Sequence, residues 1–176
     1  MDEGLYNDVL AALEAAHGDT TSDQDRTRAF NILEGFKDRP DTMEYALYFL
    51  TTPSPRHTDQ QVRHFALHCL EHIMAKRWKP QAPRKENGQV SRRGGGGGGA
   101  GGQSGEELSE AQQERLKVAM MEIMAHGTRD MQEEPQYIKV KVADLVAQVA
   151  ERDFPERWPG FLDQMMQVRA FCGDLI

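Results

Sequence analysis

The sequence VRHFALHCLEHIM at residues 62–74 decides the fold class, because its apolar residues recur at the spacing of one helix face. These residues follow the i, i+3, i+4, i+7 rule of a helix that packs on a core. They are Val62, Phe65, Ala66, Cys69, Leu70, Ile73 and Met74. The stretch therefore predicts an amphipathic helix over about residues 58–77, with Cys69 as a small buried hydrophobe rather than a reactive thiol.

The same stretch carries His64, His68 and His72, which are spaced so that all three could lie on one side of the helix. Two imidazoles at this spacing could bind one zinc ion. No Glu follows the first histidine as in the metalloprotease helix, and no second pair of Cys or His at ligand spacing occurs elsewhere. We therefore place the histidines on the faces beside the apolar seam and expect no metal.

Helical periodicity continues along the rest of the chain, and no run alternates in the manner of a strand. Ser22 with Asp25 is typical of a helix start, Gly18 of a helix end, and Asp41 follows Pro40 at another start. The chain is therefore expected to be all-α. The other predicted helices span about 3–17, 24–37, 41–52, 107–126, 134–152 and 156–170.

Residues 78–106 interrupt the helical pattern with prolines, basic residues and six consecutive glycines at 94–99. Such a composition buries too little apolar surface to offset the entropy of ordering, so a disordered Gly-rich insertion is expected. A phosphate-binding loop is excluded, because no Lys-Ser or Lys-Thr follows spaced glycines. The local basic residues leave a weak contact to RNA or a targeting role open; they are Arg84, Lys85, Arg92 and Arg93.

Without this insertion the helices fall into pairs of about forty residues, which is typical of HEAT repeats. The pairs cover 3–37, 41–77 and 107–152, with a further helix after residue 156. We therefore predict a HEAT-repeat α-solenoid of antiparallel helix pairs. A globular bundle of seven helices is the alternative that the pattern leaves open.

The composition of the chain argues against several classes of function. The formal charge of −7 argues against sequence-independent binding of nucleic acid by these residues alone. Two distant cysteines, with no signal peptide and no long apolar run, indicate the cytoplasm or nucleus and no membrane span. No nucleophile with a base, no paired carboxylates and no cofactor motif can be identified, so the protein is not expected to be an enzyme.

Two stretches carry more information than their periodicity, VRHFALHCLEHIMAKRWK at 62–79 and IKVKVADLVAQVAERDFPERWPGFLDQM at 138–165. They resemble a known family, the karyopherin-β (importin-β superfamily) nuclear transport receptors. Within the family they look most like the amino-terminal region of exportins, of the exportin-five type. The resemblance implies amino-terminal HEAT repeats one and two at 1–77, and the start of an exportin-one-like HEAT region at 107–176. It also implies that the chain is a piece of a longer receptor.

The segment FPERWPGF at 154–161 predicts a structural corner in which Pro155 ends one helix and Trp158-Pro159 open the next. Trp158 would bring a large buried area to this turn, and Trp78 would do the same after the helix at 58–77. We favour these core roles over aromatic platforms for a ligand. Phe65, Leu70 and Ile73 are the corresponding structural residues of the earlier seam.

The resemblance implies a receptor that shuttles between nucleus and cytoplasm, with no cofactor. Its implied partners are the small GTPase Ran in its GTP form, FG repeats of nucleoporins, and cargo bound by later repeats. For the exportin-five type the implied cargo is structured RNA such as precursor microRNA, or protein. An importin, a different exportin or a general HEAT scaffold for protein partners are the alternatives.

The family binds Ran on the second helices of its first repeats, which here are 24–37, 58–77 and 134–152. The polar residues off the apolar seams of these helices are our candidates for a Ran surface, although each could be an ordinary solvated side chain. They are Lys37, Gln60, Arg63, His64, His68, Lys139, Lys141 and Asp144.

Overall fold

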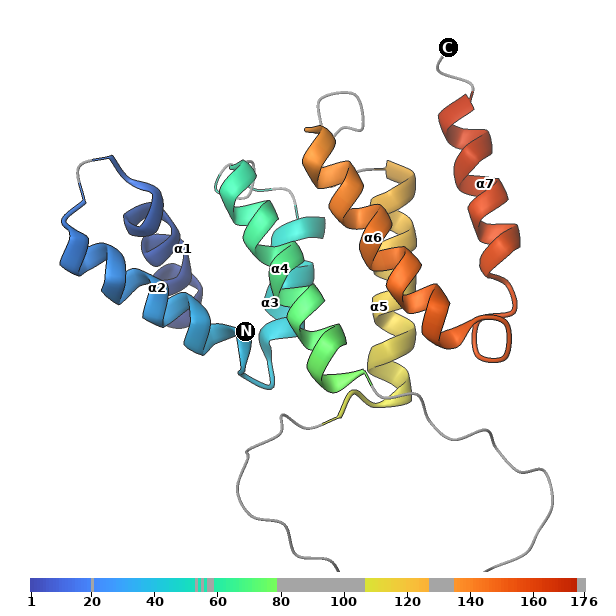
Figure 1. Cartoon of the computed structure of the whole chain (residues 1–176), viewed down its shortest axis with the longest axis horizontal. Helices are drawn as coiled ribbons and strands as arrows, with labels where there is room; N and C mark the ends of the chain where they lie inside the picture. The colour runs from blue at the N-terminus through green and yellow to red at the C-terminus, as the bar shows by residue number, and fades with distance from the viewer. Residues whose placement is uncertain are drawn as a thin grey trace, which may run out of the picture.

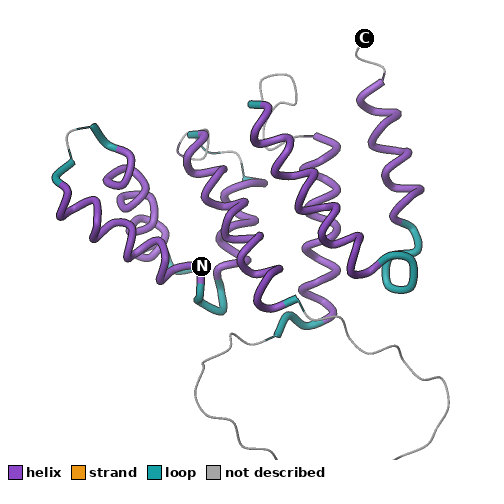
Figure 2. The backbone as a smooth tube through the Cα atoms, in the orientation of Figure 1, coloured by secondary structure: helices purple, strands orange, loops and turns teal. Residues whose placement is uncertain are grey.

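The computed structural model describes residues 1–19, 21–52, 54, 56, 59–78, 107–126 and 135–173, with side chains up to residue 168. These ranges contain helices and connecting turns but no strand, as Figure 2 shows. The all-α prediction is therefore confirmed. The helices are α1 (Glu3–His17), α2 (Asp23–Lys37), α3 (Thr42–Thr51), α4 (Gln60–Arg77), α5 (Glu110–His126), α6 (Gln136–Asp153) and α7 (Phe161–Gly173).

The helices form two layers, and successive pairs stand side by side along the molecule (Figure 1). Helices α2, α4 and α6 make one layer, here called the B layer, and α1, α3, α5 and α7 make the other, the A layer. Helices α1 and α2, α3 and α4, and α5 and α6 pack as pairs, while α4 also contacts α6, and α5 contacts α7. This stacking is a HEAT-like solenoid rather than a globular bundle.

Side-chain caps start several of the helices, and the cap predicted at Ser22 is among them. The Ser22 hydroxyl accepts a hydrogen bond from the backbone N–H of Asp25 at 3.2 Å and donates one to the Asp25 carboxylate at 2.7 Å. Asp2 and Asp59 accept bonds from first-turn N–H groups of α1 and α4 in the same way. These caps satisfy backbone donors that a helix start leaves without partners.

The predicted seam of α4 is buried throughout, including Phe65, Leu70 and Ile73. Leu67, which lies outside the seam, is also fully buried. The reason is the position of α4, which contacts α3 in its own pair and α1, α2 and α6 in the neighbouring pairs. A helix with neighbours on three sides buries more than the single stripe that periodicity reveals.

The last helix begins at Phe161 and not at residue 156, so the expectation that Trp158 and Pro159 open it is wrong. Residues 154–160 form turns instead. Phe154 and Trp158 each precede a proline, and a residue before proline is sterically disfavoured in helical conformation. The predicted corner is nonetheless confirmed, because Trp158 is 5% exposed and packs on the Phe161 ring at 4.8 Å.

The predicted disordered insertion lies outside the described residues, apart from Trp78 at its first position, which is buried. The residues flanking the remaining segment, 79–106, lie together: the backbone N–H of Leu108 donates to the carbonyl oxygen of Arg77 at 3.1 Å. Whatever its conformation, the segment leaves and rejoins the fold at one point. Extra length at such a point adds little to the entropy of closing a loop.

A buried carboxylate, that of Asp153, joins four parts of the chain. Its Oδ1 accepts hydrogen bonds from Trp78 Nε1 at 3.3 Å and Arg157 Nη1 at 3.1 Å, and Oδ2 lies 2.7 Å from Lys117 Nζ. Lys117 also donates to the Arg157 carbonyl oxygen at 3.2 Å and lies 5.7 Å from the centre of the Trp158 ring. The end of α4, α5, the end of α6 and the turn before α7 thus meet at this carboxylate.

No helix within the described ranges combines the length and apolar character that crossing a bilayer requires.

Replacing Asp153 tests this junction. Asp153→Ala removes the nearest carboxylate of the buried Lys117 ammonium, which keeps the exposed Glu114 at 3.6 Å, and the carboxylate partner of the Arg157 guanidinium. We expect the free energy of unfolding to fall by about 3–5 kcal/mol, the usual cost of breaking a buried ion pair from one side. Urea unfolding followed by far-UV circular dichroism measures the change. Glu151→Ala, at an exposed position of the same helix, is the control and should change the free energy of unfolding by less than about 0.5 kcal/mol. Equal effects of the two substitutions would contradict the role of Asp153.

Candidate interaction surfaces

Most of the predicted Ran residues lie on α4 and α6, which are neighbours in the B layer (Figure 1). Gln60, His64 and His68 come from α4, and Lys139, Lys141 and Asp144 from α6. Lys37 stands at the end of α2, where its Nζ lies 2.5 Å from Glu34 of the same helix. The helix packing therefore brings residues about seventy to eighty positions apart onto one face, as the repeat prediction requires.

Several of these residues form a polar contact line between α4 and α6, which we call the α4–α6 seam. At one end the Tyr137 hydroxyl donates to Gln60 Oε1 at 3.2 Å. The His64 ring meets the Tyr137 ring edge-on with centres 5.5 Å apart, and the His68 ring with centres 4.5 Å apart. Tyr137 is thus a member of this surface that sequence reasoning missed, although it adjoins the core residue Ile138.

Glu71 completes the seam by binding two of the predicted residues. Its Oε2 lies 2.6 Å from Lys141 Nζ and 3.2 Å from His68 Nδ1. The hydrogen bond from Lys141, followed by weaker contributions of the Lys141 and His68 charges, holds the pKa of the Glu71 carboxyl below its usual range. The position of Glu71, three residues after His68, was the available sequence signal for this pair.

His64 is half-buried, and its surroundings disfavour a positive charge on the ring. Burial is the largest cause that lowers the pKa of the His64 imidazole, and the nearby His68 and Lys141 add to it. A neutral His64 can pack edge-on against the two neighbouring rings without bringing a further cation to this face.

The remaining candidates differ in exposure. Lys139 is half-buried and Asp144 is exposed, and neither forms an ion pair with a residue that the structure describes. Arg63 is only 6% exposed, so its placement on an outward polar face is wrong. The burial of Arg63 has the same cause as that of Leu67, since α4 has neighbours on three sides. Arg63 therefore cannot present its guanidinium to a partner in this conformation.

A second contact of the same kind joins α2 to α4. Asp38 Oδ1 lies 2.8 Å from His72 Nε2 and 3.0 Å from Lys76 Nζ. These hydrogen bonds, that of His72 first, lower the pKa of the Asp38 carboxyl. Both junctions between B-layer helices thus carry one carboxylate shared by a histidine and a lysine.

The histidines of α4 therefore lie beside the apolar seam, as expected. Within the described ranges, no three His, Cys, Asp or Glu side chains are grouped so as to hold a metal ion. Cys69 is fully buried, and desolvation raises the pKa of its thiol to about 12. A thiol with this pKa is protonated at neutral pH, which agrees with its prediction as a small core hydrophobe.

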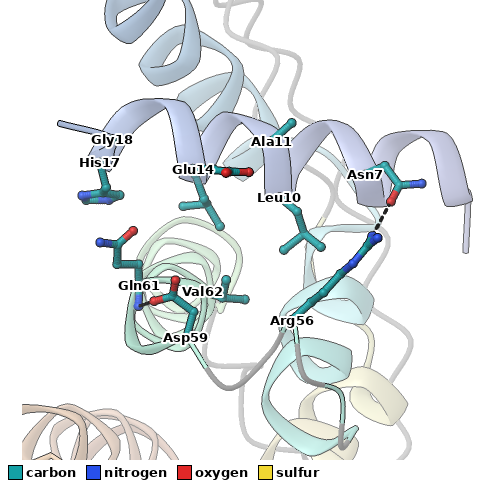
Figure 3. Close-up of a pocket in the computed structure, with 11 residues that line it drawn as sticks. Asn7, Leu10, Ala11, Glu14, His17, Gly18, Arg56, Asp59, Gln61 and Val62 are labelled. Carbon is teal, nitrogen blue, oxygen red and sulfur yellow. Dashed lines mark hydrogen bonds between the residues drawn. The ribbon is translucent and has the colours of Figure 1, made fainter. Parts of the chain in front are cut away.

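A separate hollow of about 620 Å³ lies between α1 and the start of α4, and Figure 3 shows its side chains. Sequence analysis gave no indication of it, because its two walls come from different repeats. Its lining residues are Asn7, Leu10, Ala11, Leu13, Glu14, His17, Gly18, Arg56, Asp59, Gln61 and Val62. Position 18 suits glycine, because the Cβ atom of any other residue there would lie only 2.7 Å from the Thr21 hydroxyl oxygen.

The amino-acid sequence has curated relatives, although no protein family model matches it. It is 24% identical to Exportin-5 of Dictyostelium discoideum over 164 residues, which are 93% of this chain and 12% of that protein. It is 29% and 27% identical to Exportin-5 of Homo sapiens and Mus musculus, each over 104 residues, 59% of this chain and 6% of theirs. The chain is related to the exportins.

This exportin-like, karyopherin-family relationship agrees with the stacked helix pairs of the structure. A match of 164 residues in a chain of 176 must extend to both sides of segment 79–106. The similarity to this relative therefore includes residues of both halves of the fold. The chain spans about an eighth or less of the length of these relatives.

The α4–α6 seam predicts a pH-dependent stability. Because the pKa of Glu71 is lowered in the folded state, its ion pairs stabilise the fold above about pH 4.5, and this stabilisation is lost as the pH falls through the folded-state pKa. Lys141→Met should reduce the free energy of unfolding at pH 7 by about 0.2–1 kcal/mol, as for a partly exposed pair. In strong acid the free energies of unfolding of the variant and the parent should become equal. Urea unfolding at several pH values measures both. A difference that persists unchanged in acid would show that packing of the Lys141 stem, and not its charge, is responsible.

Proposed function

We propose that this chain works in nuclear export, as a receptor segment that binds Ran in its GTP form. The observation that carries the proposal is the match to Exportin-5 across 93% of the chain. The stacked helix pairs support it, since a solenoid offers a long surface whose curvature can change through small rotations between repeats.

The surface proposed for Ran is the B-layer face of α2, α4 and α6. Lys139 and Asp144 support it, because both are accessible and unpaired among the described residues. Lys141 is held by Glu71, and Gln60 by Tyr137, so a partner would exchange existing contacts for new ones there. Such exchange adds less affinity than a new contact, but it selects for a partner of complementary charge.

Cargo would bind to further repeats of a longer form of the protein. In this proposal the cargo is structured RNA of the precursor-microRNA type, recognised by shape and backbone, or a protein. The formal charge of −7 on this chain supports placing RNA contacts elsewhere. Binding of Ran-GTP and of cargo would strengthen each other by the same factor, and FG nucleoporins would carry the complex between nucleus and cytoplasm.

Binding to Ran loaded with a non-hydrolysable GTP analogue or with GDP tests the proposal. We expect the 176-residue chain to bind the GTP form at least about tenfold more tightly in isothermal titration calorimetry, a difference of about 1.4 kcal/mol. With the longest form of the protein, a hairpin RNA should strengthen this binding. Weakening by cargo would indicate an importin, and equal binding of both nucleotide forms would favour a general HEAT scaffold.

Matched charge variants locate the surface. Lys139→Gln with Lys141→Gln should weaken binding of Ran-GTP by on the order of tenfold, because each substitution removes a positive charge from α6, one of the helices of the proposed face. Ala111→Glu with Val118→Glu changes the net charge equally, but at exposed positions of α5 in the A layer. This control should bind as the parent does. Equal affinities of the two double variants for Ran-GTP would contradict the placement of the Ran-binding surface on the α4–α6 face.

A further inference from the structure

The hollow between α1 and α4 has a continuous wall formed by one face of α1. Positions 7, 10, 11, 14 and 17 line it, and this spacing keeps these five on one side of the helix, with Gly18 directly after its end. The facing wall consists of Asp59, Gln61 and Val62 at the start of α4, with Arg56 at one end (Figure 3). A volume of about 620 Å³ lies within the range of ligand-binding sites.

The middle of the hollow is apolar. Leu13 and Val62 are 3% and 5% exposed and form its floor, and half-buried Leu10 lies beside them. The exposed Ala11 on the same wall adds only a methyl group, which leaves room above the floor. An aliphatic side chain placed here would bury the part of Leu10 that is now open to water, against a floor that is already buried.

The two ends of the hollow differ in charge. The carboxylates of Glu14 and Asp59 lie towards the His17 end, and neither pairs with a cation among the described residues. Asp59 is fixed in place because its Oδ1 accepts the backbone N–H of Gln61 at 2.8 Å. At the opposite end Arg56 Nη1 donates to the amide oxygen of Asn7 at 3.0 Å, so a neutral group and not a carboxylate holds the guanidinium.

The length of the α1 wall indicates the size of an occupant. From residue 7 to residue 17 the helix rises by about 15 Å, at 1.5 Å per residue. An extended peptide advances about 3.3 Å per residue, so about five residues match this length. The two carboxylates would repel the phosphates of a nucleic acid, whereas a basic side chain of a peptide would pair with them.

We propose that this hollow binds a short extended segment of a partner protein, about five residues long, in which a Lys or Arg lies next to an aliphatic residue. The basic group pairs with Glu14 and Asp59, the aliphatic side chain covers Leu10, Leu13 and Val62, and an acidic group at the far end meets Arg56. The site is formed by α1 and the start of α4, and its lining residues do not include Lys139 or Lys141 of the proposed Ran face.

An array of random capped pentapeptides, probed with the labelled 176-residue chain, tests the proposal. The expected enrichment is a Lys or Arg adjacent to Leu, Ile or Val, with an acidic residue at the other end. The tightest of these peptides should bind the Glu14→Gln, Asp59→Asn double variant at least about tenfold more weakly in fluorescence polarisation. Asn at position 59 keeps the helix cap, so the fold is preserved.

A steric pair of variants separates this hollow from other surfaces. Ala11→Trp fills the space above the apolar floor and should abolish binding, whereas Ala111→Trp, on an exposed position of α5, should not change it. Glu14→Lys should shift the array preference from basic to acidic residues. The proposal is overturned if no peptide is enriched over its scrambled sequence, if enriched peptides lack a basic residue, or if Ala11→Trp binds them as the parent does.

Discussion

The buried carboxylate of Asp153 is the interaction on which the carboxyl-terminal half of this structure depends. It accepts from Trp78 after α4, faces Lys117 of α5 and binds Arg157 of the turn before α7. A carboxylate with no exposed surface is stable only because these donors surround it. The same contacts fix the point at which segment 79–106 leaves the fold, since Trp78 directly precedes that segment. An interruption of this length is therefore compatible with a continuous solenoid.

The junctions between repeats combine two kinds of contact with different consequences. Apolar packing, such as that of Phe36 on Phe65 with ring centres 6.0 Å apart, excludes water and resists salt. On the B layer, by contrast, partly exposed carboxylates bridge histidine and lysine across the junctions. Such pairs are weak, screened and easily exchanged. A surface built in this way can give up its internal contacts to a partner at low cost, which suits the proposed role as a binding surface.

The two candidate surfaces illustrate what sequence reasoning could reach. Four of the predicted residues, Gln60, His64, His68 and Lys141, do meet at the α4–α6 seam, because the forty-residue period places these helices side by side. Their partners Tyr137 and Glu71 were missed, because a contact between helices depends on their relative rotation and not on spacing within either one. The hollow between α1 and α4 could not be predicted from the sequence for the same reason. Arg63 was wrongly predicted to lie on an exposed face, because the periodicity of one helix does not show how many other helices surround it.

By itself the sequence determined the helical class, the boundaries of most helices, the cap at Ser22, and the buried seam of α4, since these follow from local hydrogen bonding and the helical period. Sequence resemblance alone also indicated the exportin relationship. Only the tertiary structure decided that α7 begins after the Trp158 turn, that Asp153 joins four segments, and that α1 and α4 enclose a hollow. These features arise where segments far apart in the chain bury one another's side chains, and no local pattern specifies that geometry.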